Sequence, residues 1–505
     1  MSRANSWTGD DAPKDDCGVF AVYAPGEAVA RLTYFGLYAL QHRGQESAGI
    51  AVSQHGRLRV YKDMGLVSQV FNAPALTPLT GDLAIGHVRY STTGASTWEN
   101  AQPTFGATPS GDVALAHNGN LTNTAALAGW LAELTPDAGH RPGVATSDTT
   151  LLTALLAAQP GSTDQALDAI LPRLEGAFSL VILAAEAIWA VRDRHGLRPL
   201  CLGQLDQGWV LASESAALDI VGASFVRELA PGEVVRIDAQ GVASRRFADP
   251  RPQVCLFEYV YLSRPDSLLG GRTVHNIRVK IGKLLAEQCP AEADLVMPVP
   301  DSGTPAAIGY AAGSGIAYGQ GFVKNAYVGR TFIQPTQQLR QLGIRLKLNP
   351  LRQVVAGKRL VVVDDSIVRG NTQRQVIAML RAAGAAEVHV RIASPPVMWP
   401  CYFGIDLADQ GDLIAAQLDV AAIASSLGAD SLGYVSLDAL IAATHQPADE
   451  LCTACFSGRY VACVPPAAAA GLGLGPNCRG QATQPPALRA ALADCGAAGC
   501  DKEGA

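Results

Sequence analysis

Strand-like and helix-like runs alternate through the second half of the chain, and this alternation restricts the fold more than any other feature. Strands joined through helices run parallel, because each helical connection returns the chain to the edge where the previous strand began. The pattern therefore predicts a doubly wound parallel α/β sheet after about residue 272. The strand-like runs lie at 293–300, 359–366 and 387–395, and the helix-like runs at 278–288, 304–315 and 372–384.

The first half is rich in short apolar runs bounded by Gly, Asn and Asp, which are typical of strands and turns. Helix-like runs at 122–134 and 147–159 lie between them, and this combination predicts a layered α+β sandwich. A stretch rich in Pro and charge, at 248–255, separates the halves. We therefore expect a polar leader at 1–16, a first domain at 17–250, a second domain at 251–464 and a low-complexity, mostly disordered tail at 465–505.

The composition indicates a cytosolic globular protein. The 505 residues are 48% hydrophobic and carry a formal net charge of −6, which argues against general binding to nucleic acids or anionic membranes. No apolar run reaches the roughly 18 residues that a membrane span needs, and residues 1–16 lack the apolar core of a signal peptide. In the cytosol, metal binding or catalysis is a better expectation for the 11 cysteines than a disulfide framework.

The run RLVVVDDSIVRGNT, at 359–372, ends an apolar strand in two adjacent carboxylates, Asp364 and Asp365. Parallel sheets bind ligands at the carboxyl ends of their strands. The following turn offers backbone N–H groups and hydroxyls at a helix N-terminus, which suits phosphate, and Arg369 adds a positive charge. Because two carboxylates repel phosphate, they suit Mg²⁺ or sugar hydroxyls. An ordinary strand-to-helix turn is the alternative, and the run is not a Walker loop.

This run resembles the loop with which type I phosphoribosyltransferases bind phosphoribosyl pyrophosphate. The resemblance implies that Asp364 and Asp365 contact the ribose hydroxyls and that the next residues grip the 5-phosphate. The run 296–311 resembles that family's loop near the pyrophosphate, which implies that Ser302 and the two carboxylates hold Mg²⁺. Asn371 and Gln373 depart from the smaller hydroxyl residues that we expect there. The implied loop residues are Ser366, Ile367, Val368, Arg369, Gly370 and Thr372.

Cys17 follows the polar leader and opens a strand-like run. A thiol needs a base to become a nucleophile, and His42, His87 and His117 are candidates if the fold brings them close. If the leader is removed after Asp16, the new α-amino group, with an ordinary pKa of about 7.7–8.0, is itself a suitable base. A buried structural thiol is the simpler alternative.

Three other motifs match the three polar parts of glutamine. In HNGN, at 117–120, we expect Asn118 and Gly119 in a turn after a strand, where an amide and an unhindered N–H can form an oxyanion hole. Arg89 can bind a carboxylate, and Asp148 can bind an ammonium group. Each motif alone also fits a common Asn-Gly turn, a surface ion or a helix cap.

The motifs of the first half resemble, in order, the glutamine-hydrolysing N-terminal-nucleophile domain. They are CGVF at 17–20, LQHRGQESAGI at 40–50, GHVRYSTTG at 86–94, HNGN at 117–120 and SDT at 147–149. Together with the phosphoribosyltransferase motifs, they resemble the glutamine phosphoribosylpyrophosphate amidotransferase family over about residues 17–460. The family fold implied is an αββα N-terminal-nucleophile sandwich followed by a type I phosphoribosyltransferase domain.

The resemblance also implies the chemistry. The leader is a removed propeptide, Cys17 attacks glutamine, Arg89 and Asp148 hold it, and Asn118 and Gly119 stabilise the oxyanion. Ammonia would pass through a dry path to phosphoribosyl pyrophosphate and give 5-phosphoribosylamine, the first step of purine biosynthesis. The run 324–340 would close over the sugar phosphate. A homotetramer inhibited by purine nucleotides is implied as well.

Two other classes of function are weighed against this one. A ligand-sensing regulator on a phosphoribosyltransferase fold is opposed by the glutamine motifs and by the negative net charge. Sugar-aminating and asparagine-forming relatives share the glutamine domain but lack VVVDDSIVRG.

Four cysteines form a separate pattern: Cys452 and Cys455 make a C-x-x-C pair, and Cys255 and Cys401 stand alone. Their spacing leaves zinc, an iron–sulfur cluster, a redox pair and structural roles open. One branch of the family carries a 4Fe–4S cluster on cysteines in these contexts. The resemblance therefore implies a structural, oxygen-sensitive cluster on these four. We expect packing roles for Cys201, Cys289 and Cys463.

Overall fold

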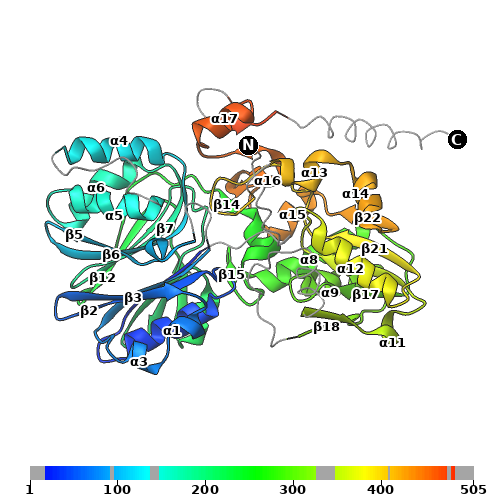
Figure 1. Cartoon of the computed structure of the whole chain (residues 1–505), viewed down its shortest axis with the longest axis horizontal. Coiled ribbons are helices and arrows are strands. Elements are labelled where there is room, and N and C mark those ends of the chain that lie inside the picture. The colour runs from blue at the N-terminus through cyan, green and yellow to red at the C-terminus, as the bar shows by residue number, and fades with distance from the viewer. Residues whose placement is uncertain are drawn as a thin grey trace, which may run out of the picture.

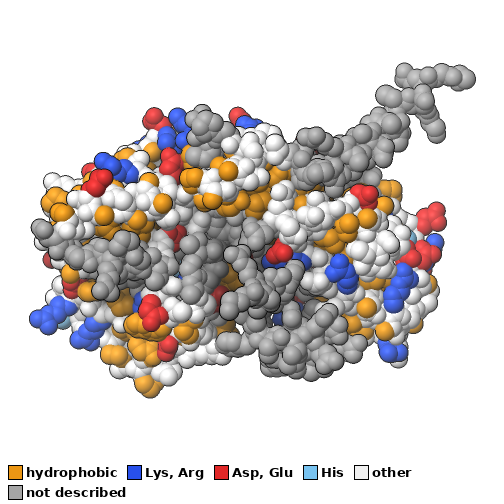
Figure 2. All heavy atoms as spheres, turned by 45° about the horizontal axis from the view of Figure 1, so that its top comes forward, with side chains coloured by type: hydrophobic (Ala, Val, Ile, Leu, Met, Phe, Trp, Pro, Cys, Tyr) orange, Lys and Arg blue, Asp and Glu red, His pale blue; other side chains and the backbone are white. Residues whose placement is uncertain are grey.

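The computed structural model describes residues 17–90, 96–136, 147–325, 347–407, 410–474 and 479–483. Figure 1 shows two halves side by side, the N-terminal half in blue and cyan and the other half in green to orange. Figure 2 shows acidic and basic side chains interspersed over the visible face rather than gathered into one basic surface. Among the described residues, no helix is long and apolar enough to cross a membrane.

The first half contains two antiparallel sheets. In the described part of the chain, one sheet has seven strands in the order β11-β9-β10-β1-β4-β2-β3, which places β1 at its centre. Its strands are β1 (Gly18–Tyr23), β2 (Ser47–Gln54), β3 (Arg57–Met64), β4 (Leu83–Arg89), β9 (Cys201–Leu205), β10 (Gly208–Ala212) and β11 (Ser224–Glu228).

The second sheet has six described strands in the order β13-β12-β8-β7-β6-β5. Its long strand β6 pairs with β7 and carries the HNGN motif. Its strands are β5 (Thr104–Thr108), β6 (Gly111–Leu121), β7 (Gly176–Leu183), β8 (Ile188–Arg192), β12 (Glu233–Asp238) and β13 (Gly241–Arg246).

The two sheets face each other across an apolar core that includes Val19, Ile85, Ala116 and Val181. Alternate residues of each strand point into this core, and those between them face a layer of helices. The predicted αββα sandwich is therefore confirmed. The helices are α1 (Val29–Ala39), α2 (Val67–Val70), α3 (Ala73–Leu76) and α7 (Ser215–Ile220) beside the first sheet, and α4 (Thr124–Leu134), α5 (Asp148–Ala158) and α6 (Thr163–Ile170) beside the second.

The second half is built on a parallel sheet in the order β17-β20-β21-β22 within the described residues. Helices pack on both faces, which confirms the doubly wound architecture. The strands are β17 (Leu295–Pro298), β20 (Arg359–Asp364), β21 (Glu387–Ile392) and β22 (Ser431–Tyr434). The helices are α8 (Val274–Gln288), α9 (Thr304–Ser314) and α15 (Leu437–Thr444) on one face, and α12 (Asn371–Ala382) and α14 (Val420–Leu427) on the other.

Short elements complete the described chain. They include the parallel pair β14 (Val254–Cys255) and β23 (Leu451–Cys452), and the antiparallel pairs β15 (Leu268–Leu269) with β16 (Arg272–Thr273), β18 (Phe322–Lys324) with β19 (Leu348–Pro350), and β24 (Arg459–Tyr460) with β25 (Gly480–Gln481). The short helices are η1 (Trp98–Asn100), η2 (Leu171–Arg173), η3 (Glu258–Leu262), α11 (Arg352–Val355), η4 (Gln410–Asp412), α13 (Ile414–Gln417), η5 (Ala448–Glu450), α16 (Ala454–Ser457) and α17 (Pro466–Gly471).

The start of the predicted disordered tail is folded. Helix α17 and strand β25 lie in it, and Ala469, Leu472 and Ala482 are buried in the core of the second half. Their small apolar side chains give this stretch enough buried surface to pack. Residues 475–478 and 484–505 of the predicted tail, and the leader 1–16, lie outside the described residues.

Candidate active sites

Cys17 lies directly before the central strand β1, and only 6% of the residue is exposed. Its thiol donates a hydrogen bond to the Tyr90 carbonyl, with Sγ and O 3.4 Å apart. Gly18 pairs with Val88, so Cys17 lies beside the end of β4, where Arg89 is buried. The structure therefore brings the predicted nucleophile next to the predicted carboxylate ligand. The rest of that motif, residues 91–94, lies outside the described residues.

Asn118 and Gly119 lie inside β6, so the predicted turn is wrong. The strand stays extended and pairs with β7 through both residues, opposite Ser179 and Phe178. Gly119 has φ +140°, a conformation that favours glycine, and a Cβ there would lie 2.1 Å from the Ala177 carbonyl oxygen. The close approach of the two strands explains why position 119 requires glycine.

The Asn118 side chain is fully buried, and neither its Oδ1 nor its Nδ2 has a hydrogen-bond partner in the structure. Leaving such a group unsatisfied costs about 1–3 kcal/mol. A buried amide that keeps both polar atoms unsatisfied is consistent with a group that bonds to a ligand. Asn118 thus has the property expected of an oxyanion donor.

Asp148 begins α5, where Ser147 caps the helix. Its Oδ2 accepts a hydrogen bond from Leu121 N at 3.2 Å and lies 3.5 Å from His117 Nδ1. Burial opposes ionisation of Asp148, but the His117 charge and hydrogen bonds from His117, Leu121 and Thr149 outweigh it and lower the pKa. These contacts hold an anionic Asp148 against β6, the strand that carries Asn118 and Gly119.

The three histidines proposed as bases make other contacts. His87 Nε2 lies 3.0 Å from the His117 carbonyl and so joins β4 of one sheet to β6 of the other. This contact brings the Cys17–Arg89 pair and the Asn118–Gly119 pair to the same region between the sheets. His42 Nε2 lies 2.6 Å from Glu214 Oε1. None of these contacts involves the Cys17 thiol.

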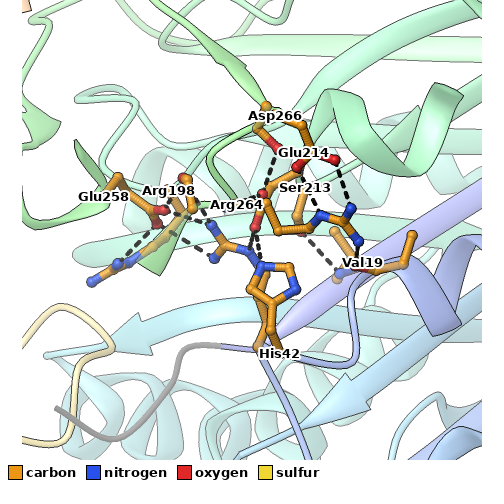
Figure 3. Close-up of polar contacts among 12 residues, drawn as sticks. Val19, His42, Arg198, Ser213, Glu214, Glu258, Arg264 and Asp266 are labelled. Carbon is orange, nitrogen blue, oxygen red and sulfur yellow. Dashed lines mark hydrogen bonds and ion pairs between the residues drawn. The ribbon is translucent and has the colours of Figure 1, made fainter. Parts of the chain in front are cut away.

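A buried ionic network joins the two halves (Figure 3). Arg43 Nε lies 2.5 Å from Glu214 Oε1, and Arg43 Nη2 lies 2.5 Å from Glu258 Oε2. Arg264 N also donates to Glu214, at 2.8 Å. Burial alone would raise the pKa of Glu214, but the charges of His42 and Arg43 and hydrogen bonds from His42 and Ser267 hold it well below its ordinary value. Ser213, which precedes Glu214 in the chain, accepts a hydrogen bond on its Oγ from Val19 N of β1.

Two further contacts tie the second half to the glutamine site. Asn120 Nδ2 donates to the Tyr402 carbonyl at 2.9 Å. Arg198 donates to the Phe403 carbonyl through Nε and Nη2, at 2.8 and 2.7 Å. Asn120 and Arg198 were not identified from the sequence, because nothing in it shows that they face residues more than 200 positions away.

In the second half, Asp364 ends β20 and Asp365 follows it, both buried. Ser302 hydrogen-bonds to Asp365, as the predicted site requires. Burial raises the pKa of both carboxyls, and the Asp365 charge raises that of Asp364 further. A divalent cation would relieve this crowding of two carboxylates.

Two residues that sequence analysis did not assign complete this site. Gln373 Nε2 donates to Asp364 Oδ2, so the departure from a hydroxyl residue at 373 supplies a contact of its own. Arg278, buried on α8, is close enough for its charge to oppose the raised pKa of Asp365. Arg278 could have been identified from the sequence, because it is a charged residue on the apolar face of a predicted helix.

The predicted phosphate loop leads from Asp365 into α12. Gly370 has φ +82° and precedes the first helical residue, Asn371. Arg369 Nη2 lies 3.3 Å from Asp412 Oδ2, and Ile414 N donates to the Val368 carbonyl. Ile367 and Val368 are buried, so they anchor the loop while the backbone N–H groups of the first turn of α12 lack helical acceptors. The predicted closing run lies outside the described residues, except at 324 and 325.

The structure brings the four predicted cluster cysteines together. Cys255 and Cys452 are paired across β14 and β23, and the Met398 and Trp399 N–H groups donate to the Cys455 carbonyl. Burial raises the pKa of Cys452 to about 12, and Cys401 and other nearby thiols interact electrostatically with it and with Cys255 and Cys455. None of these four cysteines forms a disulfide in the structure.

The same four thiols are not arranged around a single ion. Across the described part of the chain, no three His, Cys, Asp or Glu side chains are grouped to hold one metal ion. A 4Fe–4S cluster takes one thiolate at each iron, so the four neighbouring cysteines, three of them buried and Cys401 half-buried, supply the donor set that such a cluster requires.

An αββα sandwich with a cysteine before a central strand, joined to a doubly wound sheet with an Asp-Asp phosphate loop, defines the class: a glutamine amidotransferase fused to a phosphoribosyltransferase fold. Residues 87–219 match the family model described as a glutamine amidotransferase domain. A Mycobacterium tuberculosis protein named amidophosphoribosyltransferase is 59% identical over 458 residues, which cover 89% of this chain and 87% of that protein. The chain belongs to the amidophosphoribosyltransferase family.

Two solved structures share the fold. One, described as the allosteric regulatory enzyme of purine biosynthesis, has 42% identity and a TM-score of 0.83, with 89% of this chain and 97% of that chain covered. The other is glutamine phosphoribosylpyrophosphate amidotransferase from B. subtilis, complexed with ADP and GMP. It has 43% identity and a TM-score of 0.81, with 88% of this chain and 97% of that chain covered.

Proposed function

We propose that this chain converts phosphoribosyl pyrophosphate, glutamine and water into 5-phosphoribosylamine, glutamate and pyrophosphate, the first step of purine biosynthesis. The observation that carries the proposal is that one chain holds a Cys17 site and an Asp364–Asp365 site, joined by buried hydrogen bonds between the halves. Ammonia released at the first site reaches the second without passing through water, where it would be protonated.

At the glutamine site, removal of residues 1–16 makes Cys17 the first residue. Its α-amino group takes the thiol proton as the sulfur attacks the amide carbon, and returns the proton to the leaving ammonia. Water then hydrolyses the thioester to glutamate. Asn118 and Gly119 stabilise the oxyanion, and losing one such donor typically costs about 10²–10³ in rate. Arg89 holds the substrate carboxylate, and the anionic Asp148 holds its ammonium group.

At the phosphoribosyl site, Asp364 and Asp365 bind the ribose hydroxyls and Ser366–Thr372 bind the 5-phosphate. Ammonia attacks the anomeric carbon, and the bond to pyrophosphate breaks. Mg²⁺ held by Asp364, Asp365 and Ser302 would neutralise charge on the departing pyrophosphate. The oxygen donors, and the raised pKa of two crowded carboxyls, support this choice of ion.

We assign a structural 4Fe–4S cluster to Cys255, Cys401, Cys452 and Cys455. It would tie the C-terminal segment to the start of the second domain. Anaerobically purified protein is expected to contain four irons and four acid-labile sulfides per chain and to lose them in Cys401→Ser. The control is Cys289→Ser, at a half-buried cysteine outside the group. Iron retained in Cys401→Ser, or zinc in its place, would contradict the assignment.

We further propose a cytoplasmic homotetramer that purine nucleotides inhibit. Support for the inhibition by nucleotides comes from two solved relatives, one described as an allosteric regulatory enzyme and one complexed with ADP and GMP.

The deciding experiment replaces the nucleophile. Cys17→Ala should lower glutamine-dependent synthesis by at least about a thousandfold, because no other group can form the thioester, and should leave synthesis from high ammonia intact. Cys201→Ala, at a buried cysteine of the same half, is the control. If a folded Cys17→Ala protein also loses synthesis from ammonia, the proposal that the two reactions take place at separate sites is wrong. The intact mass of the purified protein shows whether residues 1–16 have been removed. Active enzyme that still carries Met1 would refute the proposed removal.

A further inference from the structure

A cleft of about 320 Å³ opens where the two halves meet, away from both proposed active sites. The described lining contains three arginines and one histidine, Arg251, Arg459, Arg479 and His195, and no carboxylate. Gln253 also lines it. The chain as a whole carries a formal net charge of −6, so this grouping of three arginines runs against its overall charge.

The walls of the cleft come from separate parts of the chain, and backbone hydrogen bonds hold one of them firmly. Arg251 N donates to the Arg194 carbonyl at 2.8 Å, and Gln253 N donates to the His195 carbonyl at 2.7 Å. These bonds lay the segment between the halves along the loop after β8. His195 Nδ1 lies 3.0 Å from the Arg251 carbonyl, so the imidazole is oriented as well.

The opposite wall is the C-terminal segment. Strands β24 and β25 pair through Arg459 with Gln481 and Tyr460 with Gly480, and Arg479 directly precedes that pair. The Tyr460 hydroxyl donates to the Pro400 carbonyl at 2.8 Å, and its ring is buried. The exposed Arg459 and Arg251 therefore face one cleft from independently anchored backbones, so no flexible loop has to close for both to reach a ligand.

Nearby carboxylates only partly compensate this charge. Glu175 lies 4.0 Å from Arg479, and Asp193 is committed to the N–H groups of Phe178, His195 and Leu197. Burial lowers the pKa of His195; Asp193 opposes this shift, whereas the charges of Arg194 and Arg479 add to it. In addition, Arg194 Nε is buried without a hydrogen-bond partner.

We propose that this cleft binds a compact anion with two or more phosphate groups, at a site distinct from the catalytic centres. Guanidinium groups bind phosphate oxygens in pairs, and several cations on opposite walls suit a chain of phosphates better than one carboxylate. Among the described lining residues, the rings of Tyr460 and His195 are both buried, so the phosphates and not a nucleobase would be recognised. The bound anion would crosslink the loop after β8 to the segment that follows Cys452 and Cys455, and so stabilise it.

The test uses inorganic tripolyphosphate and the full-length, anaerobically purified protein. Calorimetric titration should show a binding event whose affinity falls at least tenfold in Arg459→Glu and in Arg251→Glu. Both arginines are exposed, so these variants should fold. Arg246→Glu makes the same charge change on the exposed end of β13, outside the cleft, and should bind like the wild type.

Two measurements distinguish binding in the cleft from binding at the proposed catalytic sites. Tripolyphosphate bound at the phosphate loop would give an event that survives in Arg459→Glu, whereas the cleft event should disappear. Glutamine-dependent synthesis should stay within twofold of wild type in the cleft variants, so the test does not depend on the proposed reaction. The proposal is overturned if every tripolyphosphate-binding event of the wild type is also present in Arg459→Glu. Arg459→Gln, which keeps a polar side chain, should show an intermediate loss, and an unchanged affinity there and in Arg251→Glu would also refute it.

Discussion

At the scale of single residues, the proposed glutamine site contains polar groups whose protonation state is controlled by burial. His87 is fully buried, and burial is the main cause that lowers its pKa to about 3, with the Arg89 and His117 charges adding to the shift. Its neutral ring bridges the two sheets through the His117 carbonyl. The bridge is thus maintained at neutral pH without a buried charge.

This depressed pKa makes stability depend on pH. Below its ordinary pKa of about 6.5, His87 takes up a proton in the unfolded chain but not in the folded one until about pH 3. Protonation therefore stabilises the unfolded state relative to the folded one. The free energy of unfolding falls by up to about 1.4 kcal/mol per pH unit as the pH drops from about 6.5 to about 3. Between pH 6.5 and 5, the free energy of unfolding of His87→Gln, measured in urea, should fall by about 1.6 kcal/mol less than that of the wild type. His275→Gln, at an exposed histidine of α8, should follow wild type, and equal pH slopes in all three proteins would contradict the argument.

At the scale of elements, β6 is positioned from outside its own sheet. Asn120 follows the two residues proposed to stabilise the oxyanion and donates to the carbonyl of Tyr402, the residue after Cys401. The loop that carries a proposed cluster ligand therefore touches the strand that carries the proposed oxyanion donors. A small displacement of the strand would misplace Asn118 and Gly119.

We expect Asn120→Ala to reduce the kcat of glutamine-dependent synthesis about fivefold to tenfold, because one hydrogen bond is worth about 1 kcal/mol and its loss frees the strand. The KM for glutamine and the ammonia-dependent rate should change little. Asn123→Ala removes a comparable amide bond, to the Arg173 carbonyl within the first half, and is the control. If the two variants lower the rates with glutamine and with ammonia alike, Asn120 has only a structural role.

At the scale of the whole molecule, the two halves share a polar interior. Arg43 bonds Glu214 of the first half and Glu258 of the second, and all three side chains are at most 1% exposed. Ala177 and Leu197 of the first half also lie in the apolar core of the second. The halves should therefore unfold together.

Replacing Arg43 with Met leaves two buried carboxylates without their main partner, which typically costs about 3–5 kcal/mol. Thermal unfolding of Arg43→Met should begin at a clearly lower temperature and separate into two transitions. Arg381→Ala breaks an ion pair with Asp430 at the surface and should cost less than about 1 kcal/mol. A single unshifted transition in Arg43→Met would show that the network does not hold the halves together.

Local patterns were sufficient for the architecture. Hydrophobic periodicity predicts where strands and helices alternate, and turn-forming residues predict where each strand ends. Both signals act over a few residues. The same is true of the Asp364–Asp365 run, because a strand, a turn and a helix N-terminus are contiguous. Asn118 and Gly119 were identified as a pair, but their conformation was not, since pairing with β7 keeps the strand extended where an isolated Asn-Gly would turn.

The amino-acid sequence by itself determined the two layered halves, the cysteine directly before β1 and the loop that enters α12, because each is encoded within one stretch of chain. The tertiary structure decided which distant groups meet: Asn120 with Tyr402, Arg43 with both Glu214 and Glu258, and the basic walls of the cleft. Those contacts join positions up to 282 residues apart, and their energies come from burial and charge, which no local pattern contains.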